Sequence, residues 1–170
     1  MIELLILYSL TKRERTLYSL RSDITEKFGY FTKPSVGTIH PALKRLLQSN
    51  VVTIRNTFSQ GGKKSTYYSL GLHWQKKFTD LFFTPLSENP TNFFTELQTR
   101  IAVMSLLDND LKQTFIEDIK LKLESYGLDL KNALVDEYIT YDMYQTALLK
   151  KNIEDVQSYK NLINELEKSL

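Results

Sequence analysis

At 170 residues the chain is long enough to bury one core or a pair of small ones. Hydrophobic residues make up 42% and charged residues 25%, which is typical of a soluble globular protein. The chain has no cysteine, which excludes disulfides and thiolate zinc sites and fits a reducing cytoplasm. Its longest apolar run, at residues 1–10, is far shorter than the ~20 residues of a membrane span and has no basic flank like that of a signal peptide. We therefore expect a cytoplasmic protein with no membrane segment.

The charge is distributed unevenly along the chain. Residues 1–85 contain 13 Lys and Arg against 5 Asp and Glu, whereas residues 86–170 contain 9 against 15. A split of +8 and −6 indicates that one half meets a polyanion, although a chance imbalance between two domains would look the same. The asymmetry alone does not identify DNA.

The first half predicts three helices in chain order. An apolar helix covers residues 2–10. A second helix with one apolar face follows, and it ends at Gly29. Ser35 is a candidate N-cap for the third helix. The buried arc of that helix consists of Val36, Ile39, Leu43, Leu46 and Leu47. Its opposite face carries Gly37, Thr38, Pro41, Lys44, Arg45 and Gln48, a composition that suits insertion into a groove.

Two strand-like segments follow, at residues 51–58 and 65–70. The turn between them contains Gly61 and Gly62 and carries Lys63 and Lys64. Three helices followed by a hairpin with a basic tip describe a winged helix-turn-helix domain.

The second half predicts helices only. Pro85, Ser87, Asn89 and Pro90 mark a junction, so we expect domains at residues 1–84 and 85–170. Two apolar seams with alternating spacings of three and four residues follow, at 116–133 and 149–170. Such a seam packs within one chain or against a second copy, and we expect a second copy. The predicted dimerisation residues are Leu149, Val156, Tyr159, Ile163 and Leu166. The expected fold class is mainly α with a small β-hairpin wing, a winged helix-turn-helix followed by a helical, coiled-coil-like dimerisation arm.

The residues of the third helix and the hairpin resemble a known family. Residues 34–46 read Pro-Ser-Val-Gly-Thr-Ile-His-Pro-Ala-Leu-Lys-Arg-Leu. They are similar to the PadR signature Pro-Ser-x-Gly-Thr-Ile-Tyr-Pro-Ala-Leu-x-Arg-Leu. The Gly-Gly-Lys-Lys tip and the Tyr-Tyr-Ser-Leu strand at 67–70 resemble the family's wing. The resemblance covers residues 1–83, and three positions depart from the pattern. His40 replaces the usual tyrosine, Gly71 follows Leu70 in place of threonine, and Leu17 replaces the glycine before Tyr18.

The resemblance implies a transcriptional regulator of the PadR type. It implies a homodimer that binds an inverted repeat near a promoter, usually as a repressor, and that in some members is released by a small phenolic or drug-like effector. The predicted DNA-binding residues are Ser35, Thr38, His40, Lys44, Arg45, Lys63 and Lys64. Arginine can donate two hydrogen bonds to guanine, whereas lysine more often holds phosphate.

An aromatic set follows the wing and offers a candidate effector pocket. Its residues are Trp74, Phe78, Phe82 and Phe93, which serve equally well as core between the two domains. No nucleophile-base pair or carboxylate dyad stands in a recognisable motif, so we expect no catalysis, no cofactor and no metal. The competing function is a winged-helix protein-interaction module without specific DNA binding, which the motif and the charge split disfavour.

Overall fold

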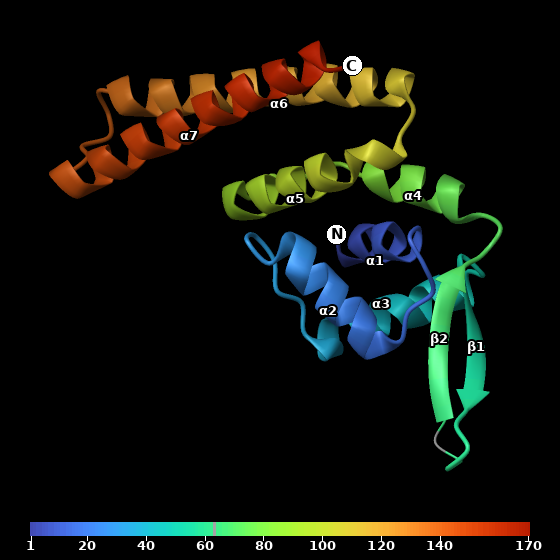
Figure 1. Ribbon diagram of the computed structural model, residues 1–170. Coiled ribbons are helices and arrows are strands. Elements are labelled where there is room, and N and C mark those ends of the chain that lie inside the picture. Colours follow the sequence, from blue (N-terminus) through green and yellow to red (C-terminus); the bar gives the residue numbers. More distant parts are fainter. Residues whose placement is uncertain (63) are drawn as a thin grey trace. The chain divides into compact units, whose positions relative to one another are not determined.

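The computed structural model describes residues 1–62 and 64–170 and divides into two compact units, Met1–Leu106 and Leu107–Leu170 (Figure 1). The first unit contains α1 (Ile2–Leu10), α2 (Leu17–Phe28), α3 (Val36–Gln48), β1 (Val52–Phe58), β2 (Lys64–Leu70), α4 (Trp74–Phe82), α5 (Pro90–Val103) and the 3₁₀ turn η1 (Met104–Leu106). The second contains α6 (Asn109–Val135) and α7 (Met143–Lys168). The predicted fold class, helices followed by a hairpin wing and a helical C-terminal part, is confirmed.

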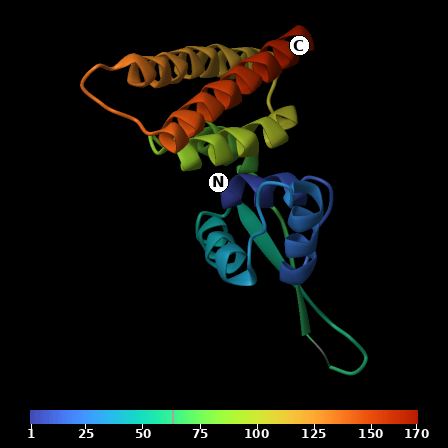
Figure 2. The ribbon, with the colours of Figure 1, turned by 90° about the vertical axis from the view of Figure 1, so that its left-hand side faces the viewer.

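Helix α1 is the centre of the first unit. Its residues Leu4, Leu5, Ile6, Leu7 and Leu10 are all buried. A helix that is apolar all round must be covered on every side. Helices α2, α3, α4 and α5 and strand β2 provide this cover, and both views of the ribbon show α1 lying among them (Figures 1 and 2).

The caps of α2 and α3 follow directly from their local sequences. Thr16 accepts a hydrogen bond from the backbone N–H of Ser19, and Ser35 accepts one from that of Thr38. Each cap satisfies an N–H group that the first turn of a helix leaves without a partner. The predicted N-cap at Ser35 and the predicted end of α2 at Gly29 are confirmed. The caps fix where α3 begins, and therefore which of its side chains face outward.

Strands β1 and β2 form an antiparallel hairpin that extends away from the helices of its unit (Figure 2). The register pairs Val52 with Leu70 at the base and Phe58 with Lys64 at the tip. At the base, Arg15 and Tyr68 exchange two backbone hydrogen bonds of 3.0 and 2.8 Å, which add a third short segment to the sheet. The base of the wing is therefore joined to the turn between α1 and α2.

A buried polar network holds that turn in place. The carboxylate of Asp23 accepts hydrogen bonds from Ser9 and from Arg15, whose Nη2 lies 2.6 Å from Oδ1. Lys27 pairs with the same carboxylate at 2.9 Å. Asp23 and Arg15 are 8% and 6% exposed, so neither charge is well hydrated and each depends on the other. The network joins α1, the turn and α2 in one arrangement.

Helix α5 packs in the first unit, although the sequence predicts a domain boundary before it, after residue 84. The guanidinium of Arg100 donates hydrogen bonds to the carbonyls of Phe82 and Thr84, both at 2.6 Å. These bonds satisfy carbonyls at the end of α4, and α5 also contacts α1. These contacts place residues 90–103 in the same unit as the winged helix. The predicted domain limits, 1–84 and 85–170, stay a prediction.

Helices α6 and α7 form an antiparallel pair in the second unit (Figure 1). Lys120 pairs with Glu167 at one end and Glu124 with Lys160 further along, so residue numbers fall on α7 as they rise on α6. At Gly127 the helices approach so closely that an added Cβ would lie 3.2 Å from a methyl group of Val156. Glycine is therefore used here for close packing, and α6 continues through it.

We predict that Asp23→Asn lowers the free energy of unfolding by about 3–5 kcal/mol, because it leaves the Arg15 charge buried without a counter-charge. Glu26→Gln, which removes an exposed carboxylate from the same helix, should change it by less than about 0.5 kcal/mol. Urea unfolding followed by circular dichroism measures both. Equal effects of the two variants would contradict this role for the network.

The same network predicts a pH dependence. Burial acts to raise the pKa of Asp23, but hydrogen bonds from Ser9 and Lys27 and the charge of Arg15 together hold it below its ordinary value of 3.8. A carboxyl whose pKa is lowered by folding stabilises the fold above pH 3.8, and this stabilisation is lost as the pH falls through the lowered pKa. Asp23→Asn should abolish this part of the acid sensitivity in urea unfolding series at several pH values.

Candidate nucleic-acid interface

The outward face of α3 is set by the residues that it buries. Ile39, Ala42, Leu43 and Leu46 are buried, so the opposite side of the helix faces solvent. At about 100° per residue, Lys44 lies near the middle of the outward side, and His40 and Arg45 lie on its two edges. All three side chains are exposed, and Lys44 and Arg45 lie on the face that the sequence predicts to be outward. The helix therefore presents one imidazole and two cations over about one and a half turns.

Ser35 and Thr38 lie at the start of α3 and are partly engaged with each other. The Ser35 Oγ accepts the Thr38 N–H at 3.2 Å and lies 3.1 Å from the Thr38 hydroxyl. Both residues are exposed. A hydroxyl used as a cap still has a lone pair and a proton to offer, so capping and a contact to a phosphate oxygen are compatible.

Arg45 forms an ion pair that its position in the sequence does not reveal. Its Nε donates a hydrogen bond to Oε1 of Glu3, at 2.6 Å, from the first turn of α1. The Glu3 side chain is only 13% exposed, whereas that of Arg45 is 59% exposed. Glu3 was not among the predicted site residues. It is the only charged residue in the otherwise apolar segment 1–10, and this was the available signal.

The wing brings a lysine to the same side as His40. Lys64 opens β2, is exposed, and lies opposite Phe58 in the register. With His40 it lines a hollow of about 510 Å³ between the start of α2, the outer edge of α3 and the wing. The other lining residues are Thr16, Leu17, Tyr18, Ser65, Thr66 and Tyr68. The predicted site residue Lys63 lies outside the described residues.

Tyr18 is a site residue that the sequence reasoning missed. Its side chain is 74% exposed on the first turn of α2 and borders the hollow that contains His40 and Lys64. Large aromatic side chains are more often buried, and an exposed one with a free hydroxyl is suited to contact a phosphate or a sugar. The sequence offers two signals for it, its place two residues after the Thr16 cap and its place after Leu17 in the family pattern.

Ion pairs inside the first unit neutralise the charge of several of its arginines. Four of the five acidic residues in 1–85 form ion pairs, Glu3 with Arg45, Glu14 with Arg55, Asp23 with Arg15 and Asp80 with Lys76. Among the residues that the structure describes, Lys44 and Lys64 have no ion-pair partner. The outward side of α3 and the wing tip therefore keep their positive charge, which is the requirement for holding a phosphate backbone.

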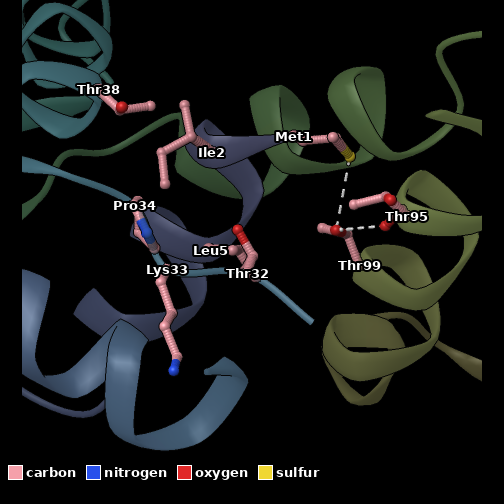
Figure 3. Close-up of a pocket in the computed structure, with 9 residues that line it drawn as sticks. All are labelled: Met1, Ile2, Leu5, Thr32, Lys33, Pro34, Thr38, Thr95 and Thr99. Atoms are coloured by element: carbon pink, nitrogen blue, oxygen red, sulfur yellow. Dashed lines mark hydrogen bonds between the residues drawn. The ribbon is translucent and has the colours of Figure 1, made fainter. Parts of the chain in front are cut away.

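A second cavity, of about 480 Å³, borders the start of α3 (Figure 3). It lies between α1, the loop before α3 and α5. Thr99 donates its hydroxyl to the carbonyl of Thr95 at 2.9 Å and lies 3.6 Å from the sulfur of Met1. The lining residues are Met1, Ile2, Leu5, Thr32, Lys33, Pro34, Thr38, Thr95 and Thr99. The cavity thus combines apolar walls with hydroxyl groups and includes one predicted DNA-binding residue, Thr38.

The predicted effector residues lie elsewhere and differ in exposure. Phe78 and Phe82 are each 1% exposed, their ring centroids are 5.9 Å apart, and Trp74 packs edge-on against Phe78. Phe93 is half-buried on α5. The rings of Phe78 and Phe82 therefore contribute to the core, the alternative role that the sequence leaves open for this set.

The predicted dimerisation residues of α7 are divided between two environments. Val156 and Ile163 are 2% and 0% exposed, within the antiparallel pair. Leu149, Tyr159 and Leu166 are half-buried. In contrast, α6 exposes Leu121, Leu128 and Val135 at 73%, 58% and 74%, spaced seven residues apart. Part of the α7 seam is therefore occupied within the chain, and a separate apolar stripe is left on α6.

The described residues contain no group of three or more His, Cys, Asp or Glu side chains that could hold a metal ion. In the same residues no helix is both long and apolar enough to cross a membrane.

The three helices, the capped third helix and the hairpin with a basic tip define the first unit as a winged helix-turn-helix domain of the transcription-regulator class. Residues 6–78 match the family model described as the Transcriptional regulator PadR-like family. This match confirms the resemblance over that part of the chain.

Solved structures similar to the chain include PadR of Bacillus subtilis in complex with operator DNA, at 20% identity and a TM-score of 0.46 over 99% of this chain and 97% of that one. A PadR family regulator from Clostridium difficile is 27% identical, with a TM-score of 0.39, over 47% of this chain and 80% of that one. The protein smu.1604c from Streptococcus mutans is 21% identical, with a TM-score of 0.43, over 96% of both chains. Comparison with curated proteins gives no match.

We predict that Lys64→Ala weakens binding to specific and random DNA about equally and reduces the slope of log affinity against log salt by about one, because it removes one phosphate contact. Lys76→Ala removes the same charge from α4, where the side chain is paired with Asp80, and should leave both quantities unchanged. Fluorescence anisotropy at several salt concentrations measures them. A change in base preference on Lys64→Ala would contradict a backbone role for the wing.

Proposed function

We propose that the protein is a sequence-specific DNA-binding transcriptional regulator that acts as a repressor. The observation that carries the proposal is that the exposed Lys44 and Arg45 lie on the outward side of α3, whose edge residue His40 lines one hollow together with the exposed Lys64 of the wing, in a domain that matches the PadR-like family model. In this arrangement α3 enters the major groove and the wing lies along the adjacent backbone. We expect such a regulator to act in the cytoplasm, and a chain without cysteine fits that reducing compartment.

Different residues of this surface serve different purposes in the proposal. Arg45 contacts base edges, together with Thr38, which lies two turns earlier on the same side of α3. Lys44 and Ser35 hold phosphate. His40 and Tyr18 lie between α3 and the wing and contact the strand that runs between them. Lys63 and Lys64 hold the backbone beyond it. No catalytic step is part of this function.

The protein binds its operator as a homodimer in this proposal, and the exposed stripe of α6 supports a second copy as the partner. Leu121, Leu128 and Val135 repeat at intervals of seven residues, which is the spacing by which helices pair. Three large apolar side chains exposed along one line of a helix are a typical interaction surface. The α7 residues Leu149, Tyr159 and Leu166, which are only half-buried, border the α6–α7 pair and extend the interface.

Control by a small aromatic effector is the last part of the proposal. The cavity beside Thr38, at about 480 Å³, falls within the usual range for small-molecule sites and adjoins the first turn of α3. A molecule bound there would contact α3 directly. By comparison, Phe78 and Phe82 would have to leave the core before they could stack on a ligand.

The direct test is selection of binding sites from a random DNA library by the full chain. We expect an enriched sequence with two-fold symmetry and half-sites about 10 base pairs apart, or a multiple of this spacing. If a dimer neutralises ~6–10 phosphates, its affinity should fall by about 10³–10⁵ between 50 and 200 mM salt. No enrichment, or binding that is insensitive to salt, would favour the protein-interaction module instead.

The dimer has a separate test, which uses two substitutions by aspartate. Leu128→Asp places a charge on the exposed stripe, so the fold should survive and the mass by light scattering should fall from twice 19.9 kDa to 19.9 kDa. Ile163→Asp buries a charge between α6 and α7 and should instead remove helix content. A folded Leu128→Asp protein that is still dimeric would contradict the interface, and a monomeric wild type would contradict the dimer.

A further inference from the structure

The carboxylate of Glu3 contacts a specific edge of the Arg45 guanidinium. The hydrogen bond runs from Nε of Arg45 to Oε1 of Glu3, and no bond from either Nη atom of Arg45 to another described residue accompanies it. The neighbouring pair at the wing is different, because Glu14 accepts from both Nε and Nη2 of Arg55. Glu3 therefore occupies one edge of the guanidinium and leaves the two terminal amino groups available.

Those two amino groups are the ones that arginine uses for end-on, two-bond recognition of guanine O6 and N7 or of phosphate. A long side chain that is free in solution loses rotamer freedom when it binds, and this lowers the affinity of each contact. An arginine already held at Nε has lost much of that freedom before it meets DNA. The hydrogen bond also fixes the plane of the guanidinium, which selects among the base edges that it can approach.

The position of Glu3 makes it a suitable support. It belongs to α1, whose following residues Leu4 to Leu7 are buried, so its backbone is fixed by the core. Its side chain is 13% exposed, and the low exposure limits both its movement and the screening of its charge. Arg45 remains 59% exposed and so keeps its access to solvent and to DNA.

We infer that Glu3 is the positioning residue for Arg45, holding the guanidinium with its two terminal amino groups toward a base edge, and that Glu3 thereby sets sequence preference without contacting DNA. The inference rests on the DNA-binding function proposed above and adds a residue to it. A second consequence follows from charge: the Glu3 carboxylate repels the phosphate backbone, so it lowers affinity for all DNA while it raises discrimination.

The experiment measures affinity for the selected site and for a scrambled site of equal length, and takes the ratio of the two. Glu3→Gln keeps an oxygen acceptor for the Arg45 Nε but removes the charge. We expect random-site affinity to rise and the ratio to fall by roughly ten-fold.

Glu26→Gln is the matched control. It removes one negative charge from the same unit, but Glu26 has no arginine partner among the described residues, so the ratio should not change. Arg45→Lys keeps the charge without the planar fork and should lower the ratio as much as Glu3→Gln.

A double-mutant cycle separates positioning from a merely structural ion pair. If Glu3 acts through Arg45, then Glu3→Gln has no further effect on the ratio in the Arg45→Ala background. The inference is overturned if Glu3→Gln weakens both DNAs equally, if the ratio stays unchanged, or if the two substitutions act additively. Glu3→Asp, which keeps the charge but withdraws it by one methylene, should give an intermediate ratio and serves if Glu3→Gln does not fold. Failure of the wild type to select any site would instead overturn the proposed function.

Discussion

The burial of the aliphatic residues of α1 is the constraint on which the rest of the first unit depends. Its five buried aliphatic residues must be covered on all sides, and each such side chain contributes about 1.5–3 kcal/mol when fully buried. The cover comes from α2, α3, α4, α5 and the wing strand β2, so every element of the candidate interface is placed by contact with the same helix. The two polar side chains of α1 that take part in networks, Glu3 and Ser9, extend this control to Arg45 and to Asp23. One helix thus positions the recognition helix, the turn and the wing together.

Residues 1–85 have a surplus of only eight positive charges, and the ion pairs leave part of that surplus on the candidate interface. The carboxylates of Glu14 and Asp23 neutralise arginines near the base of the wing and in the interior. The lysines at the middle of α3 and at the wing tip have no such partner among the described residues. Lysine suits general attraction to phosphate, whereas arginine held by a carboxylate suits a directed contact. In the proposed interface, Lys44 and Lys64 therefore serve affinity and Arg45 serves orientation.

Local chemistry made much of the fold predictable. The cap at Ser35, the end of α2 at Gly29 and the two strands of the wing all follow from neighbouring residues, and the structure confirms them. The pairing of Glu3 with Arg45 joins residues 42 positions apart and cannot be predicted from either helix alone. The same limit applies to the α7 seam. Its spacing predicts a helical partner, but only tertiary structure shows that α6 of the same chain covers Val156 and Ile163. The packing of α5 is a third example, because it depends on carbonyls at the end of α4 that accept from Arg100.

In the proposed function, Arg45 on the outward side of α3, supported by Glu3, reads a base in the major groove. Methylation interference at guanine N7 on the selected site is the decisive measurement, because the methyl group blocks the atom that the arginine is proposed to contact. Methylation of one guanine in each half-site should prevent binding of the wild type, and Arg45→Ala should be insensitive to methylation at that guanine alone. Equal sensitivity of the wild type and Arg45→Ala at every guanine would contradict it.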